Sequence, residues 1–468
     1  MNNFLLKSYL RCKRKAWLEF KGDKSYKKWS SQKSIKLITE YQNFNKFTKG
    51  ELFKGIKACK KGYKGVIGLK INYKFKENMK VEVNPSILIK THGNSIWGKY
   101  KYIPAVSKLG RRTTREHLLD LALSSSALEN LQNSNIDYGL VISSYKNQLE
   151  AEKIYLNKKL KNKAINVLYE LSEILQDNIP EITENRKKCS ICDWQHFCDK
   201  EAKLNGNLTD IDGIGSKTER ALKKIGITNV NELAEFNQLQ LNKKLSNLID
   251  KDINQTNKFI NQSKSYISGV PINLSSNLNI LRKILSKNKG VFIFDIESDP
   301  DEHHDFLYGF LTIENIHQKI KDNCYEPILN LKNINHQESF EKILAKINSH
   351  KSWPILHYGE TEKITIIKLA KTYSRSSSEI ENLKKRFIDL HKIVRNSWIL
   401  PIKNYSLKTV ANWLDFKWDQ KNVNGSKALF WWIQYKITQR YSFLEKILKY
   451  NKNDCLATLE IAKWLLQK

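Results

Sequence analysis

The sequence predicts an α/β multidomain protein, with two mixed α/β domains joined by a small helical segment, and three observations support this class. The chain has 468 residues, enough for two or three domains of roughly 150 residues each. Short apolar runs of strand length alternate with amphipathic helical stretches over residues 1–204 and again over 286–468. Between them, residues 205–285 carry helical patterns and polar stretches rich in Asn, Lys and Ser.

Composition favours a soluble protein that binds a polyanion. Lys and Arg number 80 against 48 Asp and Glu, which gives a formal net charge of +32. Such an excess favours nucleic acid as the partner, although abundant Lys, Asn and Ile also fit the codon usage of an AT-rich genome. No apolar run approaches the roughly 18 residues of a membrane span. The N-terminus is too rich in Lys and Arg for a signal peptide, so we expect a cytoplasmic protein without a membrane partner.

The first domain, residues 1–204, is expected to mix helices with short strands. One amphipathic helix is predicted over "LLKSYLRCKRKAWLEFKGD", residues 5–23, and a longer helix over 114–132. Strands are predicted in three runs that are rich in β-branched, aliphatic and aromatic residues: 65–75, 86–93 and 137–145.

The cysteines are arranged as a metal site rather than as a disulfide framework, because their number is odd and the protein is expected to be intracellular. Cys189, Cys192 and Cys198 form a C-x2-C-x5-C cluster, and Cys12 stands alone near the N-terminus. Three thiolates on one loop and a distant fourth make a complete site for either zinc or a [4Fe–4S] cluster. Such a site would close a loop of almost the whole domain and stabilise it. The other three cysteines are expected to be ordinary buried or free thiols: Cys59, Cys324 and Cys455.

The stretch "SYLRCKRKAWLEFKGD", together with the later cysteine trio, resembles the opening of the bacterial RecB-like nuclease family. Members carry an iron–sulfur PD-(D/E)XK domain of restriction-endonuclease-like α/β fold and a C-terminal ribonuclease H-like exonuclease domain. The resemblance covers nearly the whole chain. It implies that a [4Fe–4S] cluster, with zinc as the alternative, joins the two ends of the first domain through Cys12, Cys189, Cys192 and Cys198.

The acids of a PD-(D/E)XK nuclease are missing from the matching strands. Such an enzyme needs an Asp, and then a D/E-x-K on the next strand, to hold Mg²⁺. Here Asn84 or Ser86 stands near the expected Asp, Glu82 is the nearest carboxylate, and Val106 stands two residues before Lys108. We therefore expect this domain to keep the nuclease shape without the chemistry.

Basic residues after these strands suit nucleic acid. The stretch "SKLGRRTTREH" holds four cations, Lys108, Arg111, Arg112 and Arg115. An Arg guanidinium can donate two hydrogen bonds to one phosphate. We expect a DNA-binding platform here, and an ordinary surface lysine is the alternative for Lys108.

The second segment, 205–285, opens with "DIDGIGSKTERALKKIGITNVNELAEF", which fits a helix-hairpin-helix. Gly213 and Gly215 would let the amides at the start of a helix approach a phosphate, and Lys217 and Arg220 would reinforce this contact. Such modules bind the DNA backbone without recognising sequence. A plain glycine turn between packed helices and a protein-contact module are the alternatives.

The third domain, 286–468, begins with a strand of β-favouring residues that leads into a group of acids. Asp295 and Glu297 are two residues apart, so their side chains are predicted on the same side of the strand. A shared divalent ion would relieve the repulsion between them. The acids that follow are expected in a solvated loop: Asp299, Asp301, Glu302 and Asp305.

Further acids are expected to reach this pair from other parts of the domain. Glu362 is predicted on the first turn of a helix, and Tyr450 and Asp454 lie one turn apart on the last helix. Asp389 follows another predicted strand and is either a supporting acid or a missing ligand. Lys408 is expected at the surface, with contact to a phosphate as the alternative.

The order of these motifs resembles the DEDDy exonucleases of the DnaQ-like ribonuclease H superfold, and most closely the YprB-type domain. The resemblance implies a mixed sheet and two Mg²⁺ or Mn²⁺ ions held by Asp295, Glu297, Glu362 and Asp454. It also implies that Tyr450 orients the attacking water. The second motif ordinarily supplies Asp, so Glu362 departs from the pattern by one carbon.

These features predict a metal-dependent nuclease that acts on DNA, with a 3′–5′ exonuclease site in the C-terminal domain. The N-terminal domain and the hairpin are expected to bind the substrate. Two alternatives stay open, a non-catalytic DNA-binding scaffold in DNA repair and an RNA-processing exonuclease. A helicase or another repair protein is a further expected partner.

Overall fold

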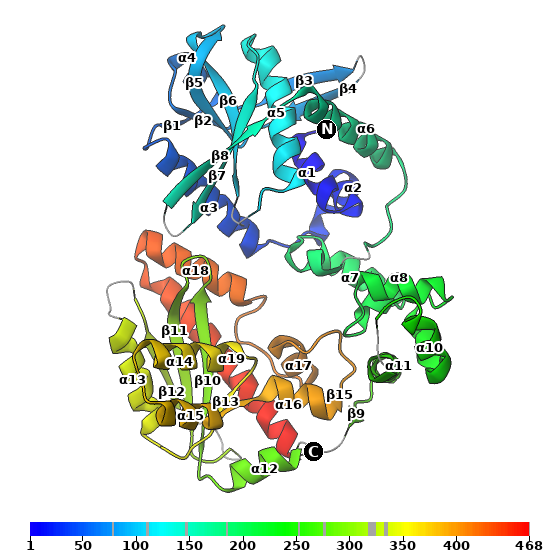
Figure 1. Cartoon of the computed structure of the whole chain (residues 1–468), viewed down its shortest axis with the longest axis vertical. Helices are drawn as coiled ribbons and strands as arrows, with labels where there is room; N and C mark the ends of the chain where they lie inside the picture. Colours follow the sequence, from blue (N-terminus) through cyan, green and yellow to red (C-terminus); the bar gives the residue numbers. More distant parts are fainter. Residues whose placement is uncertain are drawn as a thin grey trace. The chain divides into compact units, whose positions relative to one another are not determined.

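The computed structural model describes residues 1–76, 79–108, 112–145, 148–183, 186–250, 253–274, 278–316, 324–331 and 336–467. They form two compact units, Met1–Lys200 and Glu201–Lys468, which are described separately. Both units combine helices with sheets, so the predicted mixed α/β class is confirmed (Figure 1). Within the described ranges, no helix is both long and apolar enough to cross a membrane.

The first unit is built on a six-stranded sheet with the order β1-β2-β5-β6-β7-β8. The strands are β1 (Leu52–Lys54), β2 (Gly65–Ile67), β5 (Ile87–Ser95), β6 (Gly98–Lys108), β7 (Tyr138–Tyr145) and β8 (Gln148–Tyr155). α5 (Arg115–Gln132) connects β6 to β7, and these two strands run parallel. β3 (Ile71–Lys76) and β4 (Met79–Val83) form a separate antiparallel pair.

The remaining helices of this part of the chain pack around α5 and the sheet. They are α1 (Asn3–Arg11), α2 (Lys13–Lys21), α3 (Ser31–Phe47), α4 (Gly55–Lys61), α6 (Lys158–Gln176) and α7 (Gln195–Leu204). The apolar faces of α1, α2, α3, α4 and α6 share one core with α5, β5 and β6.

Two predicted elements of the first unit are each interrupted by a single residue. The helix expected over 5–23 is two helices, because the extended backbone of Cys12 (φ −163°, ψ 123°) separates α1 from α2. The strand expected over 65–75 is split into β2 and β3 at Gly68, whose φ is +66°. The other two expected strands and the long helix are present as β5, β7 and α5.

The second unit opens with a group of helices around a small apolar core of its own. These are α8 (Ser216–Lys224), α9 (Val230–Glu235), α10 (Gln238–Ser246) and α11 (Ile253–Ser268). A short strand follows that the sequence did not indicate, β9 (Ile272–Asn273), which pairs with β15 (Trp398–Ile399).

Polar contacts fix this helical group to the rest of the unit. Arg395 Nη2 lies 2.7 Å from Asp212 Oδ2, and Lys403 Nζ lies 2.7 Å from Asp210 Oδ1. Gln262 on α11 donates a 2.5 Å hydrogen bond from Nε2 to the carbonyl of Leu400. The segment predicted as a hairpin and linker is therefore packed on the C-terminal region within one unit.

The main sheet of the second unit has five strands in the order β12-β11-β10-β13-β14. They are β10 (Val291–Asp299), β11 (His304–Ile313), β12 (Tyr325–Leu329), β13 (Ile355–His357) and β14 (Phe387–Asp389). β11 is antiparallel to both neighbours, whereas β13 and β14 run parallel to β10. The sheet is therefore mixed, as predicted.

Helices cover both faces of this sheet (Figure 1). The helices are α12 (Leu278–Ser286), α13 (His336–Asn348), α14 (Thr361–Thr372), α15 (Ser377–Arg386), α16 (Leu390–Ser397), α17 (Leu407–Trp413), α18 (Gly425–Thr438) and α19 (Tyr441–Gln467). Phe292 and Phe294 of β10 pack with α13, α14 and α15, whereas Val291 and Ile293 pack with α16, α17 and α19. Residues 295 and 297 continue this second set, so the strand alternation directs them toward α19.

A glycine lets α19 approach the sheet closely. A Cβ atom on Gly309 of β11 would lie 1.7 Å from Oδ1 of Asn451 on α19. That oxygen also accepts a 2.8 Å hydrogen bond from the hydroxyl of Tyr325. Any side chain at position 309 would therefore displace the buried Asn451 side chain and break its hydrogen bond with Tyr325.

Gly309→Ala is expected to destabilise the second unit by about 3 kcal/mol, because the buried contact with Asn451 leaves no room for a methyl group. Gly425→Ala is the matched control, since an added Cβ there meets nothing within 4 Å. Thermal unfolding of the full chain measures both effects. Equal melting temperatures for the two variants would contradict this account of the packing.

Candidate functional site

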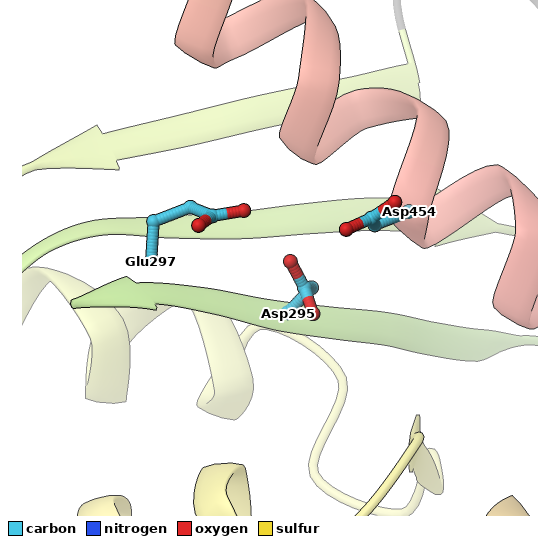
Figure 2. A group of neighbouring side chains, drawn as sticks. All are labelled: Asp295, Glu297 and Asp454. Carbon is cyan, nitrogen blue, oxygen red and sulfur yellow. The ribbon is translucent and has the colours of Figure 1, made fainter. Parts of the chain in front are cut away.

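Three carboxylates of the second unit converge between β10 and α19 (Figure 2). Asp295 and Glu297 extend from β10, and Asp454 reaches them from α19. One oxygen from each carboxylate lies within 4.8 Å of the others. Among the described residues, no other group of three or more His, Cys, Asp or Glu side chains is compact enough to share a metal ion.

Burial raises the pKa values of all three acids, and repulsion from neighbouring carboxylates adds to the shifts of Asp295 and Glu297. Glu297 and Asp454 are buried, with 8% and 7% of their surface exposed. Burial, and then the nearby Asp454 carboxylate, raise the pKa of Asp295 and of Glu297 well above the usual range. Burial raises the pKa of Asp454 to about 6, although hydrogen bonds from Trp418 and Tyr450 oppose the shift. The group therefore favours any species that adds positive charge.

Neighbouring side chains hold the acids in place. Asn451 donates from Nδ2 to Oδ2 of Asp295 over 2.7 Å, and Trp418 donates from Nε1 to Oδ1 of Asp454 over 2.7 Å. Sequence reasoning missed both donors. The position of Asn451 was available as a signal, because it precedes Asp454 by three residues and so shares its helix face. Trp418 lies in the loop after α17, where no periodicity marks it.

Tyr450 lies one turn before Asp454 on α19, as predicted, and is 4% exposed. Burial raises the pKa of its hydroxyl, and the carboxylates of Asp454 and Glu297 raise it further. The phenol therefore stays protonated at neutral pH. It contributes a hydrogen-bond donor to the site rather than a negative charge.

Glu362 is near this group but outside its compact core. It lies on the first turn of α14, is 6% exposed, and repels Asp295 and Glu297 enough to raise their pKa values. Its Oε2 lies 3.5 Å from Nδ1 of His357, and among the described residues this oxygen has no hydrogen-bond partner.

Asp389 serves as the N-cap of α16. Its Oδ1 accepts hydrogen bonds from the backbone amides of Gly359 and His391, each 2.9 Å long. The acid at this position is therefore explained by its structural role. It caps α16 and binds the amide of Gly359, which follows β13. The structure brings Asp389 to the end of β14, two strands from β10.

The expectation that Asp299 lies in a solvated loop is wrong. Asp299 ends β10, is 3% exposed, and accepts a 2.9 Å ion pair from Nζ of Lys436 on α18. The same ammonium lies 2.8 Å from Glu302 Oε2. The strand runs further than the sequence indicated, so a third alternate acid points inward and is neutralised by a lysine.

Lys408, expected at the surface, is partly exposed but also contacts the aromatic residues beside the acids. Lys408 is on the first turn of α17 and is only partly exposed. Its ammonium lies 5.0 Å from the ring centre of Tyr450 and 5.1 Å from that of Trp418. Helical periodicity could not locate it, because Trp418 lies outside the helices, in the segment between α17 and α18.

In the first unit, Cys12, Cys189, Cys192 and Cys198 line one cavity of about 250 Å³. Cys12 reaches it from the break between α1 and α2, and the other three lie on or beside α7 and the turn before it. Burial raises the pKa values of the Cys192 and Cys198 thiols. No disulfide joins any of the seven cysteines, all of which lie in described ranges.

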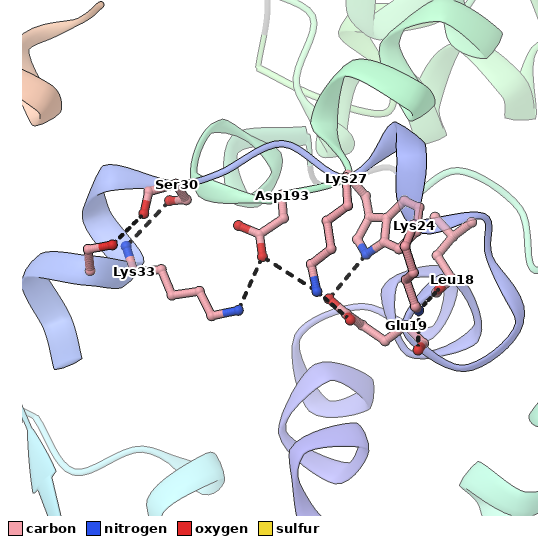
Figure 3. A network of polar contacts seen from close by, with 9 residues as sticks. Leu18, Glu19, Lys24, Lys27, Ser30, Lys33 and Asp193 are labelled. Carbon is pink, nitrogen blue, oxygen red and sulfur yellow. Dashed lines mark hydrogen bonds and ion pairs between the residues drawn. The ribbon is translucent and has the colours of Figure 1, made fainter.

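Polar contacts join the two segments that carry the cysteines (Figure 3). Lys27 lies 2.7 Å from Glu19 and 3.9 Å from Asp193, and Lys33 lies 3.4 Å from Asp193. Trp194 donates from Nε1 to Glu19 over 3.1 Å. We call these five residues the clasp, since they join the N-terminal segment to the loop that carries the cysteine trio.

The four thiols are spread more widely than one zinc ion requires. Zinc holds thiolates at about 2.3 Å, which places tetrahedral sulfur atoms roughly 3.8 Å apart. Within the described ranges, no three of the thiols lie within 4.8 Å of one another. The cysteines thus share a cavity without forming a compact single-ion site.

Asn84, which stands near the expected PD-(D/E)XK Asp, is linked through Asn3 to a buried ion pair. Asn3 donates from Nδ2 to the carbonyl of Asn84 over 3.1 Å and to Asp120 Oδ1 over 3.0 Å. Lys7 lies 2.7 Å from the other oxygen of Asp120. Burial opposes the charge of Lys7, but Asp120 outweighs it and raises the pKa of the ammonium. An internal lysine therefore compensates the buried acid of α5.

The basic residues predicted to bind nucleic acid have different surroundings. Lys108 lies 3.1 Å from Glu152 of β8, whereas Arg112 and Arg115 are exposed. Arg111 lies outside the described residues. Glu82 is partly exposed at the end of β4, and Ser86 precedes β5.

The predicted hairpin glycines lie at the start of α8. Gly213 has a φ of +87°, and Gly215 is the N-cap of α8 without a side-chain cap. Both glycines are exposed, as are Lys217 and Arg220. The geometry leaves the first amides of the helix accessible.

Comparison with known families supports a nuclease in the second unit. Residues 292–466 match the family model of the RNase_H superfamily. No curated protein matches the chain. The C-terminal part of the chain therefore has a ribonuclease H-like domain, which indicates a phosphodiester hydrolase with nucleic acid as its partner, and its carboxylate group could bind metal.

The raised pKa of Asp454 predicts a pH-dependent loss of stability in metal-free protein. A group whose folded pKa exceeds its unfolded value of about 3.9 stabilises the fold at low pH and loses this contribution as pH rises through about 6. Asp454→Asn removes the ionisation. In EDTA we expect it to match the wild type near pH 4 and to be more stable by about 3 kcal/mol at pH 7.5.

Thermal unfolding at several pH values measures this difference. Asp419→Asn is the control, because the Asp419 side chain is 59% exposed. Parallel pH profiles for Asp454→Asn and the wild type would show that burial does not raise the pKa of Asp454.

Proposed function

We propose that the C-terminal domain is a two-metal-ion 3′–5′ exonuclease that acts on DNA. The observation that carries this proposal is the convergence of Asp295, Glu297 and Asp454 within 4.8 Å in a ribonuclease H-like domain. Tyr450, four residues before Asp454, supports the DEDDy variant of this chemistry. Glu362 is the proposed fourth ligand.

The residues present fit divalent ions with oxygen ligands. Mg²⁺ and Mn²⁺ favour carboxylate oxygens, which the three acids supply at short range. Glu362 adds a buried Oε2 without a hydrogen-bond partner among the described residues, which is a costly state unless a cation binds there. When bound, such ions lower the pKa of water and stabilise developing negative charge.

The chain's own residues have separable roles in this proposal. Asn451 fixes the orientation of Asp295, and Trp418 fixes that of Asp454. The protonated Tyr450 hydroxyl can donate to or orient the attacking water. The exposed basic residues and hairpin amides would hold the substrate backbone, among them Arg112, Arg115, Lys217 and Arg220.

We also propose that the first unit is a RecB-like domain without nuclease chemistry and that its cysteines hold a [4Fe–4S] cluster. Cys12, Cys189, Cys192 and Cys198 line a cavity of about 250 Å³ and supply the four thiolates that such a cluster needs, with zinc as the alternative occupant. The missing acids support loss of catalysis, since Asn84 stands near the expected Asp and Val106 stands two residues before Lys108.

Asp295→Asn is expected to lower Mn²⁺-dependent digestion of DNA by on the order of a thousandfold, because one metal-binding charge is lost. Binding of DNA should stay within about twofold of the wild type, since the variant keeps the exposed basic residues and hairpin amides that would hold the substrate backbone. Asp301→Asn is the control, because Asp301 is an exposed acid of the same stretch.

The assay compares single-stranded DNA, duplex DNA and RNA carrying a label at either end. Release of mononucleotides from the 3′ end of DNA supports the proposal. Preferential digestion of RNA would favour an RNA-processing enzyme. Equal activity of Asp295→Asn and the wild type would rule out the proposed site, and DNA binding without digestion would favour a scaffold.

Protein purified without oxygen is expected to be brown and to contain about four iron atoms per chain. Cys12→Ser should remove most of the iron and lower the melting temperature, because the cluster joins distant segments. Cys324→Ser is the control, since Cys324 belongs to the other unit. Stoichiometric zinc without iron would establish the alternative occupant, and absence of both metals would contradict a metal site.

A further inference from the structure

We propose that Lys408 binds a non-bridging phosphate oxygen of the substrate beside the carboxylate group. This inference rests on the proposed nuclease function and adds a residue that the four acids and the tyrosine do not include. Lys408 lies on the first turn of α17, outside β10 and α19. It therefore enters the site from a third element.

Two aromatic rings determine where the ammonium of Lys408 lies. Its Nζ is 5.0 Å from the centre of the Tyr450 ring and 5.1 Å from that of the Trp418 ring. Each distance is within the range of a cation–π interaction, and two rings restrict a flexible side chain more than one. The cation is thus positioned before any ligand arrives.

The same two aromatic residues both contact Asp454. Trp418 donates from Nε1 to Asp454 Oδ1 over 2.7 Å, and Tyr450 forms a side-chain hydrogen bond with the same carboxylate. The rings that hold Lys408 are therefore attached to one of the acids. Both Asp454 and Glu297 are close enough to attract the ammonium electrostatically.

The ammonium nevertheless has no ion pair of its own. Among the described residues, no carboxylate oxygen lies within 4.0 Å of Lys408 Nζ, and the side chain donates no hydrogen bond. This differs from Lys436 of α18, which contacts Asp299 at 2.9 Å. A cation that only neutralised the acids would be expected to pair with one of them, as Lys436 does.

A phosphate suits the place that these contacts leave open. The ammonium has three N–H donors, and a phosphodiester bound next to the acids presents negatively charged oxygens. Fixed positive charge at this point would stabilise the substrate and the additional charge that develops as the bond breaks. In this arrangement Trp418 is a positioning residue, because it acts through Lys408 and Asp454.

Binding of a nucleotide without turnover tests this proposal. Titration calorimetry measures the affinity of the full chain for thymidine 5′-monophosphate in Ca²⁺, and for thymidine, which lacks the phosphate. Lys408→Met keeps the length of the side chain and removes the charge. We expect it to weaken nucleotide binding about 10- to 100-fold, as loss of a charged hydrogen bond would, with no change for thymidine.

Two further variants separate this role from a structural one. Lys408→Arg keeps a cationic donor and should bind the nucleotide within about threefold of the wild type. Lys446→Met is the matched control, because the Lys446 ammonium also lies over an aromatic ring, 5.4 Å from that of Phe443. Calorimetric Mn²⁺ affinity without nucleotide should be unchanged or higher in Lys408→Met, because a positive charge near the acids is gone.

Each result has a defined meaning. If the wild type binds the nucleotide and Lys408→Met binds it equally well, the role assigned to Lys408 is wrong and the proposed function stands. If Lys408→Met binds Mn²⁺ more weakly, the lysine orders the acids and does not recognise phosphate. If the wild type itself shows no Ca²⁺-dependent nucleotide binding, the proposed metal site and the inference from it both fall.

Discussion

Repulsion among three carboxylates is the constraint around which the C-terminal unit is organised. Asp295, Glu297 and Asp454 lie within 4.8 Å of one another in a buried setting, where like charges interact strongly. The β-sheet and α19 impose this proximity, and Asn451 and Trp418 donate to the acids without neutralising them. The fold therefore maintains a concentration of negative charge that is unfavourable until a cation binds.

Other buried acids of this protein are treated differently. Asp120, Asp210 and Asp299 each lie within 3 Å of a lysine ammonium, at 2.7, 2.7 and 2.9 Å. In a chain with 80 Lys and Arg, an internal cation is easily supplied. Among the described residues, Asp295, Glu297 and Asp454 have no such lysine partner. This difference marks the three acids as a site for a cation that binds from outside the chain.

The sequence predicted the part of the site that depends on local periodicity. Strand alternation placed Asp295 and Glu297 on one side, and helical spacing placed Tyr450 with Asp454. Long-range packing decides the rest: the extent of β10 brings Asp299 inward, and Trp418 holds Lys408 from a loop that carries no pattern.

The same limit applies to the fold. The alternation of strands and helices predicted the mixed α/β class, and the resemblance to ribonuclease H-like domains implied the mixed C-terminal sheet. It could not predict the breaks at Cys12 and Gly68, because each depends on the backbone conformation of a single residue. The close approach at Gly309 depends on a helix more than 100 residues later, so no local pattern records it.

The clasp of the first unit has a consequence for the order of synthesis. Its contacts join Glu19, Lys27 and Lys33 to Asp193 and Trp194. The hydrogen-bonded partners in these contacts are 160 or more residues apart in the chain. At roughly 5–20 residues per second, a ribosome that has made the N-terminal partners needs on the order of ten seconds or more to reach Asp193 and Trp194. Throughout that interval the nascent N-terminal helices lack the segment that completes their packing, so the unit can mature only once its last tenth has emerged.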